Sequence, residues 1–151
     1  MTASQEDYLK TIYILILHKN EARVTDIADY LQVSKASVNR ALKSLKEIDL
    51  VDYEAYGEIK LTEIGKEEAT NVIKKHNVLK AFLIQILNVD SKTAEEEAKK
   101  MKHAISEDTV NKFSEYIKSI IKVDELKCNY SPENERCQNC IKLTKHKKTG
   151  F

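Results

Sequence analysis

The sequence contains little of the two residues that most often interrupt regular structure, with only three glycines and one proline in 151 residues. Because glycine and proline mark turns and irregular segments, such segments should be scarce in this protein. Hydrophobic residues make up 42% of the chain and charged residues 32%, which is typical of a globular protein rich in helix. The composition therefore predicts a mainly α fold, arranged as one ordinary domain or two small ones.

Long hydrophobic runs are also absent. The longest one, from Ile12 to Leu17, is far shorter than the ~20 residues that a membrane-spanning helix needs. The opening stretch, MTASQEDYLK, is polar and acidic and lacks the basic and apolar regions of a secretion signal. We therefore expect a cytoplasmic protein with no membrane partner.

An excess of charge of one sign is missing as well, since 25 lysines and arginines nearly balance 24 aspartates and glutamates. A basic patch for nucleic acid would therefore have to be local. Cysteines are few, and all three lie in the last quarter of the chain, an odd number that argues against a disulfide framework. Nor does any segment supply a nucleophile–base pair, a glycine-rich phosphate loop or paired carboxylates, so we do not expect an enzyme.

The periodicity of apolar residues predicts the regular elements. Helices are expected at residues 4–18, 25–31, 35–48, 63–87, 91–104 and 107–120, and the strands of a hairpin at 50–54 and 58–61. The residues expected to cap these helices are Thr25 or Asp26, Ser34, Thr62, Asp90 or Ser91, and Ser106. The last helix should turn Tyr116 and Ile120 inward. Three parts result: a winged helix-turn-helix at 1–65, an all-helical domain at 66–124, and a cysteine- and lysine-rich tail at 125–151.

The stretch TDIADYLQVSKASVNRALKSL has the pattern of a helix-turn-helix. Its two helices each carry an inward apolar stripe, with Ile27, Ala28 and Leu31 on the first and Val38, Leu42 and Leu45 on the second. The outward face of the second helix is polar and basic, and no acidic residue lies between Ser34 and Lys46. In a chain whose charges otherwise balance, this local excess is the electrostatic footprint of a DNA backbone.

The residue types on that face also suit direct reading of bases. Arg40 can bond guanine with two hydrogen bonds, while Asn39 and Ser37 can reach base edges or phosphates. The predicted DNA-binding residues are Ser34, Lys35, Ala36, Ser37, Asn39, Arg40 and Lys43 of the helix, with Tyr56 of the hairpin wing. Two alternatives are a merely solvated charged face and a winged helix that binds another protein.

Four stretches, SQEDYLKTIYIL, RVTDIADYLQVSKASVNRALKSL, LVDYEAYGEIKLTEIGKEEA and HNVLKAFL, resemble the diphtheria toxin repressor and manganese transport regulator family. The resemblance runs in one continuous order from Ser4 to about Ile121. It implies a homodimer that binds double-stranded DNA at palindromic operators and represses metal-uptake genes when iron or manganese is plentiful. It also implies that the all-helical domain supplies the dimer contact and senses the metal.

The resemblance further implies a metal pocket between the first helix and the dimerisation domain. The matching positions are Asp7, Lys10, His76, Lys99, Lys102 and His103. Asp7, His76 and His103 offer metal donors, but the other positions carry lysine where the family has carboxylates or, at position 99, often cysteine. A charged ammonium has no lone pair to offer, and clustered cations repel iron or manganese. We expect an altered or lost pocket, although the remaining donors could form a weak or zinc-like site.

The lysines of this pocket have two interpretations. In the first, their ammonium groups occupy the volume and charge that a metal cation filled, with Lys10 or Lys99 pairing with Asp7. In the second, Lys99 and Lys102 lie on a solvated flank and pair with Glu95 one turn earlier, and His76 is a core histidine held by a hydrogen bond.

The tail offers a second sensing chemistry. Cys137 and Cys140 form a CxxC pair that could chelate with Cys128 and His146. Such a set suits zinc, and the thiolates also suit an iron–sulfur cluster. The regulator could then be metal-independent at its usual pocket and respond to redox state or to a cluster. The alternative is a basic arm with free cysteines that contacts DNA phosphates.

Overall fold

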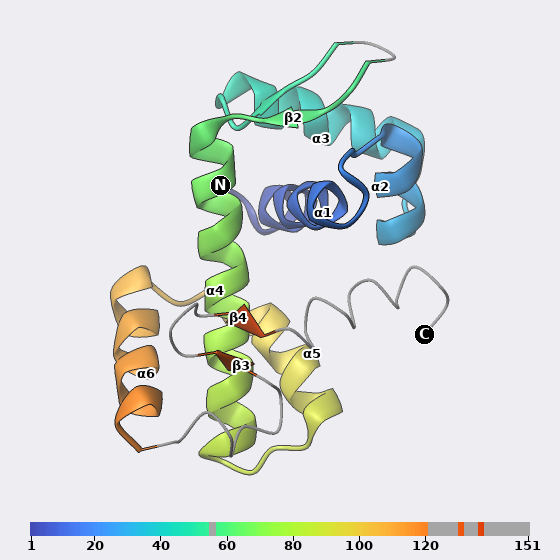
Figure 1. Cartoon of the computed structure of the whole chain (residues 1–151). Coiled ribbons are helices and arrows are strands. Elements are labelled where there is room, and N and C mark those ends of the chain that lie inside the picture. The colour runs from blue at the N-terminus through green and yellow to red at the C-terminus, as the bar shows by residue number, and fades with distance from the viewer. Residues whose placement is uncertain (55–56, 121–129, 132–135, 138–151) are drawn as a thin grey trace. The chain divides into compact units, whose positions relative to one another are not determined.

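A computed structural model describes residues 1–54, 57–120, 130–131 and 136–137 of the chain, and Figure 1 shows its elements. The helices are α1 (Ala3–Lys19), α2 (Val24–Leu31), α3 (Lys35–Glu47), α4 (Glu63–Gln85), α5 (Ser91–Met101) and α6 (Glu107–Ile120). The strands are β1 (Val51–Asp52), β2 (Lys60–Leu61), β3 (Tyr130–Ser131) and β4 (Arg136–Cys137). The predicted mainly α fold is confirmed. The chain divides into two compact units, Met1–Asn71 and Val72–Thr149.

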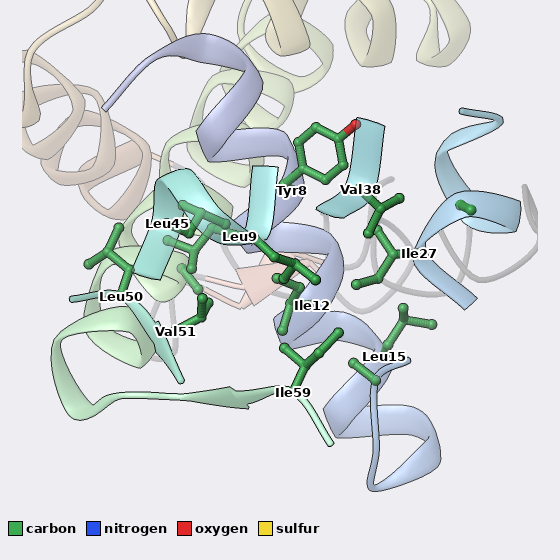
Figure 2. Packing of buried hydrophobic residues seen from close by; sticks show 14 residues of the cluster. Tyr8, Leu9, Ile12, Leu15, Ile27, Val38, Leu45, Leu50, Val51 and Ile59 are labelled. Atoms are coloured by element: carbon green, nitrogen blue, oxygen red, sulfur yellow. The ribbon is translucent and has the colours of Figure 1, made fainter. Parts of the chain in front are cut away.

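The first unit is built on α1, α2 and α3, which share one apolar core (Figure 2). Leu9 and Ile12 of α1 are fully buried, as are Leu42 and Leu45 of α3. Their spacing of three residues places each pair on one helical face. Each buried side chain of this size stabilises the unit by ~1.5–3 kcal/mol relative to exposure. The core thus holds the helix-turn-helix in place from behind.

The start of α3 is set by Ser34, whose hydroxyl oxygen accepts a hydrogen bond from the Ser37 backbone N–H at 3.1 Å. This confirms the predicted cap. The predicted cap of α2 is wrong, because that helix begins at Val24, after Arg23, with no side-chain cap. Thr25 and Asp26 therefore lie inside its first turn.

Side-chain caps also begin α1, α5 and α6. Thr2 caps α1 in a reciprocal arrangement with Gln5. Asp90 caps α5, its carboxylate accepting from the Thr93 N–H at 3.0 Å. Ser106 accepts from the Thr109 N–H at 3.3 Å and so caps α6. The caps predicted for α5 and α6 are thus confirmed.

The hairpin follows α3 and pairs β1 with β2 in antiparallel register, Val51 opposite Leu61. Its ladder is shorter than the predicted 50–54 and 58–61. Thr62 caps α4 by accepting from the Gly65 N–H at 2.9 Å, as predicted. A β-carbon at Gly65 would clash with the carbonyl oxygen of Leu50, so glycine is needed where α4 begins against the hairpin.

The second unit contains most of α4 together with α5 and α6. Its apolar core includes Leu79 of α4, Ala94 of α5, and Val110 and Ile117 of α6, all fully buried. The inward orientation predicted for Tyr116 and Ile120 is wrong, since they are 50% and 51% exposed. Only one face of α6 packs against the core, and these two residues lie off that face.

The rest of the second unit that is described is a short strand pair. Strand β3 pairs antiparallel with β4, Tyr130 opposite Cys137. Across the described residues, no helix combines the length and apolar character that crossing a membrane would require.

Candidate functional site

The exposed face of α3 carries the predicted base-reading residues. Lys35, Asn39 and Lys43 recur every fourth residue and are all exposed, as is Arg40. The opposite face of the same helix holds the buried Val38, Leu42 and Leu45. Because the apolar stripe is buried in the core, the cationic stripe has to face outward.

The first turn of α3 orients one of these cations. The Arg40 guanidinium donates to the Ser37 hydroxyl oxygen at 3.2 Å, and this oxygen also lies 2.9 Å from the hydroxyl of the cap residue Ser34. Arg40 still has further N–H donors for a ligand. Ser34 and Ser37 therefore do two jobs, since they start the helix and support Arg40.

Two adjoining hollows border α3 on its exposed side. One, of about 510 Å³, is lined by Arg23, Val24, Thr25, Lys35, Asn39, Tyr53, Glu54 and Gly57. The other, of about 600 Å³, is lined by Asn39, Arg40, Lys43, Lys46, Tyr53 and Glu54. Cations outnumber the single carboxylate in both linings together. The first unit thus presents a cationic groove between α3, the start of α2 and the hairpin.

The groove includes residues that the prediction omitted. Arg23 and Tyr53 line it, and the sequence signal for Arg23 was its place directly before the helix-turn-helix. Lys46 joins α3 to the hairpin, because its ammonium donates to the Tyr53 carbonyl oxygen at 3.0 Å and lies 3.8 Å from Asp52. Tyr56 lies outside the described residues.

A compact charge cluster occupies the second unit, with Glu95 of α5 at its centre. One carboxylate oxygen of Glu95 lies 3.1 Å from the Lys80 ammonium and 3.2 Å from Nε2 of His76, both on α4. The other oxygen lies 3.6 Å from the Lys99 ammonium, one turn further along α5. Lys80 is 1% exposed and His76 is 2% exposed. These four residues are called the Glu95 cluster below.

The environment of Glu95 keeps its carboxylate ionised. Burial by itself disfavours the charged form and raises the pKa. The hydrogen bond and charge of His76, together with the charge and hydrogen bond of Lys80, outweigh burial and hold the pKa of Glu95 far below its ordinary value of 4.5. Two lysine side chains and one imidazole thus lie around this single carboxylate.

The Glu95 cluster bears on the second interpretation of the pocket lysines, while the pairing of Lys10 or Lys99 with Asp7 stays a prediction. Lys99 pairs with Glu95, and His76 is a buried histidine in contact with that carboxylate, as the second interpretation expected. Its solvated flank is wrong for Lys102, however, which is 1% exposed. Lys102 directly follows α5 with helical backbone, its N–H donating to the Ala98 carbonyl oxygen. It lies four residues after the buried Ala98 and so continues the buried face of that helix.

The remaining pocket positions lie in both units. Lys10 of α1 is buried and Asp7 is exposed, while His103 is partly buried in the turn after α5. Within the described part of the chain, no three histidine, cysteine, aspartate or glutamate side chains gather as a metal site requires. The donor chemistry of the matched positions, half of them ammonium groups, does not fit iron or manganese.

The predicted tail site can be placed only in part. Cys137 belongs to β4, where its backbone pairs with Tyr130. Cys128, Cys140 and His146 lie outside the described residues. The zinc or iron–sulfur site therefore stays a prediction.

Comparison with known proteins adds two family matches. The model of the iron dependent repressor N-terminal DNA binding domain matches residues 1–59. The model of the iron dependent repressor metal binding and dimerisation domain matches residues 62–122. The first match contains the cationic groove and the second contains the Glu95 cluster.

Individual relatives agree with these matches. An HTH-type transcriptional regulator of Methanocaldococcus jannaschii is 40% identical over 113 residues, covering 74% of this chain and 90% of that protein. The HTH-type transcriptional regulator MntR of Shouchella clausii is 32% identical over 142 residues, covering 89% of this chain and 99% of that protein.

Solved structures show the same fold. The manganese regulator SloR superposes with a TM-score of 0.68 at 30% identity, covering 78% of this chain and 55% of that one. T. acidophilum IdeR superposes with a TM-score of 0.65 at 28% identity, covering 75% and 53%. The chain thus spans about half the length of these two solved regulators.

Proposed function

The chain belongs to the iron-dependent repressor family, that of the diphtheria toxin repressor and the manganese transport regulators, and from this premise we propose that it is a dimeric, sequence-specific repressor. The family consists of transcriptional regulators and not of enzymes. We propose that the chain binds palindromic operators of genes for iron or manganese homeostasis. Its parts would be a DNA-binding domain at 1–65, a dimerisation domain at 66–124 and a tail at 125–151.

The cationic groove of α3 is the observation that carries this proposal. Lys35 and Lys43 would neutralise phosphates, and Arg23 would add a further contact from the start of α2. Asn39 and Arg40 carry the donors and acceptors that distinguish bases in the major groove. The buried stripe behind them makes the helix a rigid support, so the contacts would form without refolding.

The dimer contact is proposed for an apolar face of the second unit. A hollow of about 280 Å³ is lined by Phe82, Thr109, Lys112, Phe113 and Tyr116. The rings of Phe82 and Phe113 meet edge to face with centroids 4.6 Å apart. Since a dimerisation domain of the family matches this region, a second copy of the chain is the expected occupant. Two-fold pairing would then set two reading helices about one DNA turn, ~34 Å, apart.

The metal response is proposed to be altered in this chain. SloR is described as a manganese regulator, and the family model names metal binding. Lys10, Lys99 and Lys102 nevertheless replace donors in the pocket, so we propose DNA binding without iron or manganese there. The second candidate is sensing through Cys128, Cys137 and Cys140, favoured by the presence of three cysteines within thirteen residues of the sequence.

Operator binding tests the proposal directly. Genomic fragments selected by the protein would be footprinted, and affinity measured by fluorescence anisotropy over a range of salt. The Arg40→Ala/Lys43→Ala variant should lose at least ~100-fold in affinity, and its salt slope should fall by about 1–2. Lys92→Ala/Lys100→Ala, which removes two exposed cations from α5, is the matched control and should bind as the parent does. Equal operator affinity of both variants would refute the proposal that α3 contacts the operator.

The effector is tested on the same fragments. Affinity would be compared in chelator, with manganese, and after anaerobic purification with and without Cys137→Ser. Manganese-independent binding is expected from the altered pocket. A binding change that depends on Cys137 would favour the tail as the sensor, whereas a strong requirement for manganese would refute the altered pocket.

A further inference from the structure

Lys80 is the unusual member of the Glu95 cluster, because a lysine rarely lies fully buried unless it is paired. It ranks with the largest fully buried side chains among the described residues. It lies one helical turn after His76 on α4, and both side chains reach the same oxygen of Glu95 on α5. The cluster therefore joins two helices through one carboxylate.

The two oxygens of that carboxylate are both in use. Oε2 faces Lys80 and His76, and Oε1 faces Lys99 at 3.6 Å. The distance of 3.2 Å between Nε2 of His76 and Oε2 suits a direct hydrogen bond. A metal ion bonded to both atoms would sit about 2.0–2.2 Å from each and would have to share this space with the ammonium of Lys80.

The charge of Lys80 also argues against a metal ion bound at Glu95 and His76. An ammonium supplies one positive charge and up to three N–H donors, but it cannot itself be a metal ligand while protonated. Lys80 thus gives Glu95 the positive partner that a bound cation would otherwise provide. A buried ion pair is not needed for stability alone, since well-packed apolar residues often serve as well. What it does provide is a fixed geometry between α4 and α5.

We propose that the Lys80 ammonium is a built-in cation that joins α4 to α5 at Glu95 and His76, so that the second unit keeps its arrangement without a metal ion. The inference rests on the proposed function only in treating this unit as the counterpart of the family's metal-binding domain. Its structural part, a permanent internal cation, stands on the cluster itself.

Replacing Lys80 by an acidic residue should turn the Glu95 cluster into a site that binds a metal ion. Lys80→Glu would leave two carboxylates and one imidazole where the parent has an ammonium, a donor set that suits manganese. The parent chain should bind little manganese in this unit, and its thermal unfolding midpoint should not move with manganese or chelator. The variant should bind about one manganese ion per chain, seen as loss of the free-ion EPR signal, and should gain thermal stability on binding. Manganese is the probe because thiolates of the tail favour softer metals.

A second variant and one control complete the experiment. Lys80→Gln removes the charge without adding an acid, and should show a smaller manganese-induced rise; Lys100→Glu, an exposed lysine on α5, should behave as the parent. If the parent is stabilised by manganese as much as Lys80→Glu is, or if neither folded Lys80 variant responds, the inference is wrong. Operator affinity of the parent is measured in parallel, so that the two proposals can fail separately. If the parent binds its operator but manganese has no effect on the Lys80 variants, only the proposal of a built-in cation is wrong.

Discussion

Helix α3 of the first unit exposes its cations to solvent, whereas the α4–α5 pair of the second unit buries one. On α3, Lys35, Arg40 and Lys43 are exposed over an apolar core, so a polyanion from outside can bind them. On α4, Lys80 is buried and bound to a carboxylate of its own chain. The contrast separates two uses of positive charge: exposed cations are available for ligand binding, while buried ones hold the protein's own helices together.

A substitution that disrupts the buried Glu95 cluster should have the largest effect on stability. Glu95→Ala would remove the carboxylate that contacts both the buried Lys80 ammonium and His76, and removing one partner of a buried pair costs ~3–5 kcal/mol. Urea denaturation would measure the loss. Glu96→Ala, at an exposed neighbouring glutamate, should change the free energy of unfolding by no more than ~0.5 kcal/mol. A small effect of Glu95→Ala would show that the cluster is open to water.

A substitution of an exposed cation on α3 should weaken operator binding and leave the stability of the fold unchanged. Arg40→Ala removes one exposed guanidinium and should cost ~1–3 kcal/mol of operator binding, about 5–150-fold in affinity. The thermal midpoint should stay with the parent's, because Arg40 has no buried partner to lose. Anisotropy titration measures the loss of operator affinity, and a melting curve on the same sample measures any loss of stability. A variant that melts early would place Arg40 among the structural residues instead.

The cap of α3 lies between these two cases. Ser34→Ala removes the acceptor of the Ser37 N–H and should cost ~1 kcal/mol of stability. It should also loosen the support of Arg40 through Ser37 and so weaken operator binding by a few-fold. Ser34→Asp restores a cap but adds an acid near phosphates. That variant should therefore recover stability and not DNA affinity, as denaturation and anisotropy would show.

The smallest effect concerns pH at the start of α5. Hydrogen bonds from Thr93 lower the pKa of Asp90 below its ordinary value of 3.8. A carboxylate whose pKa is lower in the folded state stabilises the fold above its unfolded pKa, and this contribution disappears as pH falls through the folded value. Asp90→Asn keeps a good cap but cannot titrate. Its unfolding free energy should fall less than the parent's on acidification below 3.8, and identical pH profiles would contradict the prediction.

Local features of the fold were predictable from the sequence. Ser34 caps α3 and Thr62 caps α4 because a side chain three residues before a free N–H suffices for the bond. The buried stripe of Val38, Leu42 and Leu45 follows from helical spacing alone. The wrong cap of α2 shows the limit of this reasoning, since Arg23 begins that helix without any side-chain bond and leaves no mark in the sequence.

Burial of charge could not be predicted in this way. Lys102 was expected either to replace a metal or to lie in solvent, yet it is buried beyond the end of α5. Lys80 carried no signal, because a lysine on a helix is usually exposed and Glu95, its partner, belongs to another helix. Tyr116 was expected inside and lies half exposed, for only the packing of α6 decides which of its apolar residues are covered.

The sequence by itself determined where four of the helices begin, which face of α3 is apolar, and that this helix presents cations with no acid before Lys46. These properties depend on residues within one or two helical turns of each other. The tertiary structure alone decided which charges are exposed and which are buried, and that Glu95 collects Lys80, His76 and Lys99. The physical reason is that desolvation and pairing depend on neighbours brought together by packing, and the spacing along one helix does not specify them.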